Sequence, residues 1–62
     1  MQIVVSEDTP QSTFVRITGT DDEMDAIIQE KDKLQGQGYR VVGDLVLDLE
    51  LQERTFFMER KK

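Results

Sequence analysis

The chain contains no cysteine and no histidine among its 62 residues. It can therefore form no disulfide, and it lacks the usual protein ligands of a structural zinc ion. Its length suits a single domain, residues 1–62, and a chain of about 60 residues buries only about 60% of its unfolded surface. Small domains commonly compensate with disulfides, a metal ion or self-association. Because the first two are excluded, we expect the chain to form an oligomer.

The same absences remove the side chains that most nucleophilic enzymes use. Ser6, Ser12 and Tyr39 remain, but none has a recognisable base beside it. The two glycines of residues 36–38 follow a predicted helix, whereas a phosphate-binding loop follows a strand and opens a helix. We therefore predict no enzymatic activity, no cofactor, no metal ion and no small-molecule substrate.

Long apolar runs are also missing from the sequence. No segment approaches the roughly 18 consecutive apolar residues of a membrane-spanning helix. The first ten residues, MQIVVSEDTP, have no basic region followed by a long apolar stretch, so they do not resemble a secretion signal. The lack of cysteine fits a reducing compartment. We expect a soluble, cytoplasmic protein with no membrane partner.

Basic residues are scarce, since 8 face 13 acidic residues and the net charge is −5. This charge opposes a general affinity for nucleic acid or for anionic membranes. Residues 1–30 hold seven acids and one base, Arg16, whereas residues 31–62 hold six acids and seven bases. The excess negative charge therefore lies in the first half of the chain, and we predict no nucleic-acid partner.

Residues 20–38 have the clearest helical pattern. Thr20 and Glu23 have the T-x-x-E spacing of a capping box, in which each side chain binds a backbone N–H at the helix start. The helix is predicted to begin at Asp21 and to end near residues 35–37, where glycines follow. At 100° per residue, the predicted buried face spans about 120°. It consists of Met24, Ile27, Ile28, Lys31, Leu34 and Gln35.

Four segments have the composition and alternation of β-strands. They are residues 2–6, 13–18, 39–51 and 54–60. The third, Tyr39–Leu51, has apolar side chains at six of its seven odd positions. Residues 42–45 could instead form a hairpin with Gly43 and Asp44 at its turn. We favour one continuous strand in which Gly43 is a bulge or bend, because that arrangement keeps a single apolar face.

The predicted order is β-β-α-β-β. It describes an α+β domain in which one helix packs on one face of a small four-stranded mixed sheet. The sheet is predicted to be mixed because a helical crossover makes the second and third strands parallel, while each hairpin adds an antiparallel neighbour. We expect a bacterial or phage origin, because this strand–helix–strand order is common among small proteins of those sources.

One helix covers only one face of a sheet. In these strands, however, apolar residues occupy both the odd and the even positions, so both faces of the sheet carry apolar side chains. The set predicted to face the helix is Ile3, Val5, Val15, Ile17, Val41, Leu45, Leu47, Leu49 and Phe57. The set predicted to face outward is Val4, Phe14, Val42, Val46, Phe56 and Met58. If the registers align, the outward set forms an apolar patch larger than a monomer usually exposes. If they slip, no single patch forms.

These patterns predict a small non-enzymatic protein-interaction or regulatory module. We expect it to form a homodimer through the sheet face that the helix leaves uncovered, with a further protein partner as a second possibility. The predicted partner-binding residues are Phe14, Val42, Val46, Phe56 and Met58.

The alternative function is that of an acidic inhibitor, which mimics nucleic acid and binds a nucleic-acid-binding protein. Two groups of carboxylates would carry it. They are residues 21–25, at the start of the helix, and the row of Asp44, Asp48 and Glu50 in the third strand. The helix dipole alone also favours acids in the first turn, so the first group has a structural explanation as well.

Overall fold

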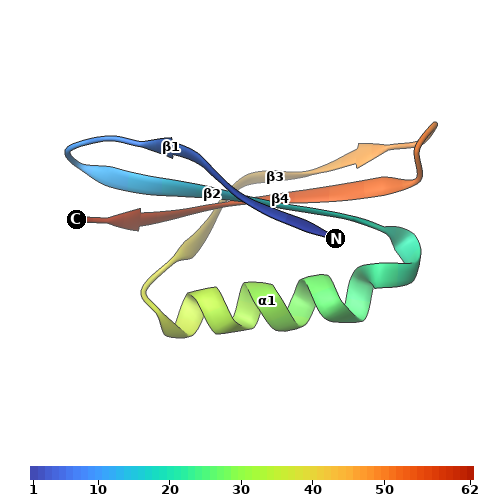
Figure 1. The fold of residues 1–62 in the computed structure, drawn as a ribbon, viewed down its shortest axis with the longest axis horizontal. Coiled ribbons are helices and arrows are strands. Elements are labelled where there is room, and N and C mark those ends of the chain that lie inside the picture. The colour runs from blue at the N-terminus through green and yellow to red at the C-terminus, as the bar shows by residue number, and fades with distance from the viewer.

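The computed structural model describes all 62 residues. The order of elements is β1 (Gln2–Asp8), β2 (Ser12–Thr20), the short 3-10 turn η1 (Asp21–Glu23), α1 (Met24–Gly36), β3 (Arg40–Asp48) and β4 (Glu53–Lys61). Figure 1 shows α1 lying along one side of the four strands. The predicted α+β class and ββαββ order are therefore confirmed.

The strands are arranged in the order β1-β2-β4-β3, and every neighbouring pair is antiparallel. The prediction of a mixed sheet is wrong. The helix does connect two strands that run in the same direction, β2 and β3, but β4 lies between them and pairs with both. A helical crossover sets the relative direction of the two strands it joins. It does not determine whether a later strand pairs between them.

β3 is one continuous strand with a bulge at its centre. Between Val42 and Val46, three residues of β3 lie opposite the single residue Phe56 of β4. One of the three, Gly43, has a φ of 71°, which glycine adopts at little cost. The bulge adds two residues, an even number, so the alternation of side chains between the two faces is the same on both sides of it.

The turn after β3 begins earlier than the sequence predicts. The Oδ1 atom of Asp48 accepts hydrogen bonds from the backbone N–H groups of Glu50 and Leu51, both at 3.1 Å. Such bonds between a side chain and nearby backbone groups stabilise a turn. Leu49 and Leu51 therefore lie in the connection between β3 and β4 rather than in the strand.

The helix start and end lie close to their predicted positions. The predicted capping box is present, and the backbone N–H of Thr20 donates to Oε1 of Glu23 at 3.0 Å. Residues 21–23 form η1, so α1 itself begins at Met24 and ends at Gly36. Local hydrogen-bonding chemistry at both ends is thus sufficient to locate this element.

The core lies between α1 and the two central strands. It consists of Val15, Ile17, Ile27 and Met58, with Met24, Leu34, Tyr39 and Phe56 packed against it. Gly19 of β2 allows α1 to approach closely, because a Cβ atom at this position would lie 2.7 Å from Cδ1 of Ile27. α1 packs mainly on β2, so the edge strands β1 and β3 keep exposed side chains on the same face.

The register of β4 corrects three side-chain placements. Met58 lies opposite Val15 and Phe56 lies opposite Ile17, and directly opposed residues in an antiparallel pair point to the same face. Met58 is fully buried beneath α1, and Phe56 packs against the same core. Phe57 points to the other face. The prediction that Phe56 and Met58 face outward and Phe57 faces the helix is therefore wrong. Both faces of this strand carry large apolar side chains, so the sequence pattern alone does not indicate which face is buried.

Candidate interaction surface

The sheet face opposite α1, called the open face below, combines apolar and charged side chains. Its central row across the strands consists of Val4, Arg16, Phe57 and Val42. Arg16 is exposed, whereas the three apolar residues are half-buried. The charge of Arg16 therefore interrupts the apolar row at its centre.

Three of the five predicted partner-binding residues lie on this open face. They are Phe14, Val42 and Val46, as their cross-strand partners show. Phe56 and Met58 lie on the opposite face, and Met58 has no exposed surface at all. The structure therefore does not bring the five residues together as one patch, and their role in binding stays a prediction.

A polar cluster occupies one end of the open face. The Ser12 hydroxyl donates to Oε2 of Glu59 at 2.7 Å, and the Arg40 guanidinium binds Oε1 of Glu59 at 3.3 Å. The hydrogen bond from Ser12 is the main reason that the pKa of Glu59 lies below its usual value, while partial burial opposes the shift and Arg40 adds to it. The cluster joins β2, β4 and β3 and holds Arg40 at the sheet edge.

The largest group of exposed apolar side chains lies on β3 and the turn after it. Val41, Leu45, Val46, Leu47, Leu49 and Leu51 are all exposed, and we call these six residues the β3 surface. Leu47 is 53% exposed and Leu49 is 85% exposed. Only Val46 belongs to the predicted binding set. The sequence predicts that Leu45, Leu47 and Leu49 are covered by the helix. They are exposed because α1 packs mainly on β2.

One flank of α1 extends this apolar surface. Ile27 points into the sheet, and Lys31, about 40° further round the helix, places Nζ 5.9 Å from the centre of the Phe56 ring on β4. Ile28 lies about 100° from Ile27 in the same sense. It therefore points along the sheet toward β3, and it is 39% exposed.

β3 is also an edge strand, so one side of its backbone has no partner strand. Edge strands with unpaired backbone groups and apolar side chains are ready to pair with another chain. The bulge at Gly43 interrupts this edge at one place. The segments 40–42 and 46–48 on either side remain regularly paired with β4.

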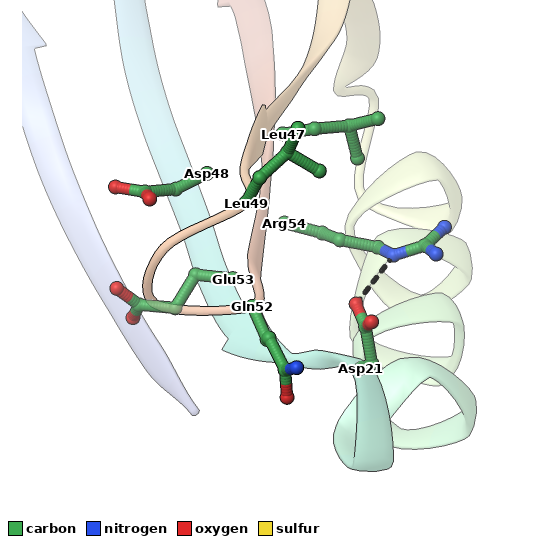
Figure 2. Close-up of a pocket in the computed structure, with 7 residues that line it drawn as sticks. All are labelled: Asp21, Leu47, Asp48, Leu49, Gln52, Glu53 and Arg54. Carbon is green, nitrogen blue, oxygen red and sulfur yellow. Dashed lines mark hydrogen bonds and ion pairs between the residues drawn. The ribbon is translucent and has the colours of Figure 1, made fainter.

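A small hollow lies where the β3–β4 turn meets the start of the helix. Figure 2 shows its lining, which consists of Asp21, Leu47, Asp48, Leu49, Gln52, Glu53 and Arg54. Nε of Arg54 donates to Oδ1 of Asp21 at 2.7 Å, and the backbone N–H of Asp21 donates to the Gln52 carbonyl at 3.0 Å. The hollow holds about 180 Å³, less than the ~300–1,000 Å³ of typical small-molecule pockets. Its contacts join the turn to the helix start.

Three acids that are distant in the sequence belong to this lining, although Figure 2 shows the carboxylates of Asp48 and Glu53 pointing away from Asp21. Asp21 comes from the first predicted acidic group and Asp48 from the second, and Glu53 joins them from β4. Asp48 and Glu53 lie directly opposite each other in neighbouring strands, an arrangement that is electrostatically unfavourable. The end of the molecule formed by the turn is therefore acidic as well as apolar.

The structure contains no group of three or more carboxylates placed to hold a metal ion. None of its helical segments has the length and apolar character needed to span a membrane. Comparisons of the chain with family models, curated proteins and solved structures found no match.

Proposed function

We propose that this chain is a small, non-enzymatic protein-interaction module that self-associates through the β3 surface. The observation that carries the proposal is the concentration of exposed apolar side chains on one edge strand and its turn, with Val41, Leu45 and Leu47 together on the helix side and Val46 on the open face. Contiguous apolar surface marks interaction sites in soluble proteins. The unpaired backbone of β3 supplies hydrogen-bonding groups beside it.

The small core supports self-association as part of the same proposal. Four apolar residues are buried in the chain alone, so a partner surface would add substantially to the buried apolar area. A standard interface buries about 800 Å² per partner. That is roughly a fifth of the 4309 Å² surface of this chain. Binding of a second copy to the folded form also stabilises it by mass action.

The open face is a weaker candidate for the contact. Phe14, Val42 and Phe57 are already half-buried by their neighbours, and Arg16 and Glu59 lie among them. Burying those charges against a partner would require compensating contacts. We therefore assign the contact to β3 rather than to the open face.

The test compares Leu47→Asp with a matched control on the other edge strand. Leu47 is 53% exposed on β3 and Val5 is 59% exposed on β1, and both lie on the helix-facing side. Sedimentation should show a dimer for the native chain and for Val5→Asp, whereas Leu47→Asp should raise the dissociation constant at least tenfold. Arg54 lies opposite Leu47 and can pair with the new carboxylate, so the monomer should stay folded. A native chain that sediments as a monomer at high micromolar concentration would contradict the proposal.

The acidic end supports a second candidate function, inhibition of a nucleic-acid-binding protein by mimicry of phosphates. It rests on the presence of Asp21, Asp48 and Glu53 at one end of the molecule, around one hollow. Attraction between exposed charges weakens with salt, whereas apolar contacts do not. Binding of a basic nucleic-acid-binding protein that falls steeply with salt, and that is lost in Asp21→Asn/Glu53→Gln, would favour this function. Binding that is independent of salt would exclude it.

A further inference from the structure

We infer that two copies of the chain pair through β3, antiparallel and edge to edge, about a twofold axis that passes through the bulge at Asp44. The inference rests on the proposed self-association and specifies its geometry. An antiparallel pair of strands with this symmetry has its axis perpendicular to the sheet. The two four-stranded sheets would then form one continuous sheet of both copies.

The sequence of β3 is complementary to itself in this register. Arg40 lies opposite the partner's Asp48, Val41 opposite the partner's Leu47 and Val42 opposite the partner's Val46, so that base meets acid and apolar meets apolar. Arg40 and Asp48 share the open face of the sheet, as their partners Glu59 and Glu53 on β4 show. The opposed residues therefore point to the same side, as cross-strand pairing requires.

Other registers lose this match. A shift by one residue would place helix-side residues against open-face residues. A shift by two keeps the faces but places Arg40 opposite the partner's Val46, or Val42 opposite the partner's Asp48.

The bulge independently selects the same register. The chain between Val42 and Val46 spans only the distance between Phe57 and Thr55, so β3 is shortened there by two residues. When the axis passes through the bulge, the same shortening occurs at the same level in both copies. Segments 40–42 and 46–48 then stay aligned with their counterparts, whereas any shifted register places a bulge against a regular segment.

Charge on neighbouring strands supports the pairing of Arg40 with the partner's Asp48. Asp48 lies directly opposite Glu53 within its own chain. Neither carboxylate of this pair forms an ion pair with a basic side chain of the same chain. The side chain of Arg40 is 65% exposed and uses one guanidinium nitrogen to bind Glu59. Its other donors remain available, because the guanidinium carries five N–H groups. The partner's Arg40 would therefore bring positive charge to the two carboxylates.

The same arrangement joins the apolar strips beside the two helices. A twofold axis perpendicular to the sheet keeps both helices on one face, with the two β3 strands between them. Val41, Leu45 and Leu47 of both copies would form the floor between the helices, and Ile28 points toward this floor from each side. The pairing would give the exposed apolar side chains of β3 and Ile28 apolar neighbours from the second copy.

The two Asp44 carboxylates would lie near the axis and oppose the pairing. The bulge also removes regular pairing from the centre of the interface, which limits unrestricted strand addition. The expected product is a closed, reversible dimer, because the β3 edge of each copy is occupied by the other.

The test uses engineered cysteines, for which the native chain offers no competing thiol. In the double variant Arg40→Cys/Asp48→Cys, the two sites lie opposite residues six apart on β4. Six residues of a strand span about 20 Å, whereas a disulfide needs Cα atoms within about 7 Å. Only cysteines of different copies can therefore join. Oxidation should give a covalent dimer with two disulfides and no larger species.

Two further variants keep the test decisive. Val41→Cys/Leu47→Cys has the same register on the helix side and retains Asp48, so it covers the case in which losing the Asp48 turn contacts unfolds the first variant. Val42→Cys/Asp48→Cys is shifted by two residues on the same face, and it should cross-link at least tenfold more slowly. If the native chain sediments as a dimer but both in-register pairs cross-link no faster than the shifted pair, self-association stands and the register is wrong. If the native chain is monomeric, both proposals fail.

Discussion

β1 and β3 lie at opposite edges of one sheet, and α1 leaves apolar side chains of both uncovered. Val5 on β1 is as exposed as Leu47 on β3. The strands differ in charge, because the only charged residues of β1 are the acids Glu7 and Asp8, whereas β3 has a base at one end and an acid at the other. Exposure alone therefore does not distinguish a binding edge. The proposed pairing of β3 rests instead on the pattern of charge along the strand.

The edges also differ in what surrounds them. Asp8 of β1 forms an ion pair with Lys62, whereas Asp48 of β3 accepts hydrogen bonds only from backbone N–H groups and has no basic partner within the chain. β1 is followed by a short connection to β2, whereas β3 continues into a turn that carries two exposed leucines. The apolar surface of β3 thus extends beyond the strand through two leucines, whereas that of β1 extends only through Met1 at its other end.

The largest expected effect concerns the packing of α1 on the central strand β2, which stabilises the sheet to which both edge strands belong. Gly19→Ala places a Cβ atom 2.7 Å from Ile27 and should push α1 away from β2, lowering the free energy of unfolding by about 1–3 kcal/mol. Gly36→Ala adds a methyl group where no atom lies within 4 Å, and it should raise stability by up to about 1 kcal/mol. Urea denaturation measures both. Equal effects of the two substitutions would show that helix contact at Gly19 is not tight.

A smaller effect is expected on the pH dependence of stability, through the Glu59 carboxylate that binds Arg40 of β3. The pKa of Glu59 is lowered first by the Ser12 hydroxyl and also by Arg40 of β3, so the folded state favours the carboxylate. The resulting stabilisation is complete above the unfolded value of about 4.3 and is lost as pH falls through the lower folded pKa. Thermal unfolding of Glu59→Gln should therefore show a lower melting temperature at pH 7 and a weaker decline between pH 5 and 3. An unchanged pH profile would contradict the assignment.

Asp8 provides the matching change on the β1 side. Its pKa is lowered mainly by the side-chain hydrogen bond from Lys62 and then by that from Thr13. Asp8→Asn should reduce the same acid dependence of stability without altering dimerisation. A change in the dissociation constant of Asp8→Asn would show that the β1 edge takes part in the contact.

The smallest expected effect is a gain in affinity. Asp44→Asn removes the two like charges at the proposed axis and should lower the dimer dissociation constant by a factor of about 1.4 to 5, as expected for a cross-strand charge pair of ~0.2–1 kcal/mol. Glu7→Gln on β1 removes the same charge and should leave the constant unchanged. Sedimentation equilibrium at one salt concentration compares them. An equal gain in both variants would mean that net charge, not the position of Asp44, governs association.

The parts of the fold that depend on local chemistry were predictable from the sequence. Thr20 and Glu23 located the helix start, and Gly43 located an irregularity within β3, because caps and left-handed glycines act within a few residues. The orientation of β4 was not predictable. Phe56, Phe57 and Met58 are all apolar, so only the long-range register with β2 decides which of them enter the core.

The candidate surface was only partly predictable for a related reason. The alternating leucines indicated an apolar face, and Val46 was correctly placed on the open side of β3. Whether Leu45 and Leu47 are covered depends on where α1 lies across the sheet. That position follows from the insertion of β4, which moves β3 to the edge and away from α1. No pattern within the third strand indicates that β4 lies between β2 and β3.

Hydrogen exchange measured at several protein concentrations tests the difference between the two edges most directly. Backbone amides of an edge strand that pairs with a second copy become protected as the dimer forms. We predict that protection in residues 40–42 and 46–48 increases from low to high micromolar concentration, while protection in β1 stays constant. Protection that does not depend on concentration in either strand, or that rises equally in both, would contradict the assignment of β3 as the binding edge.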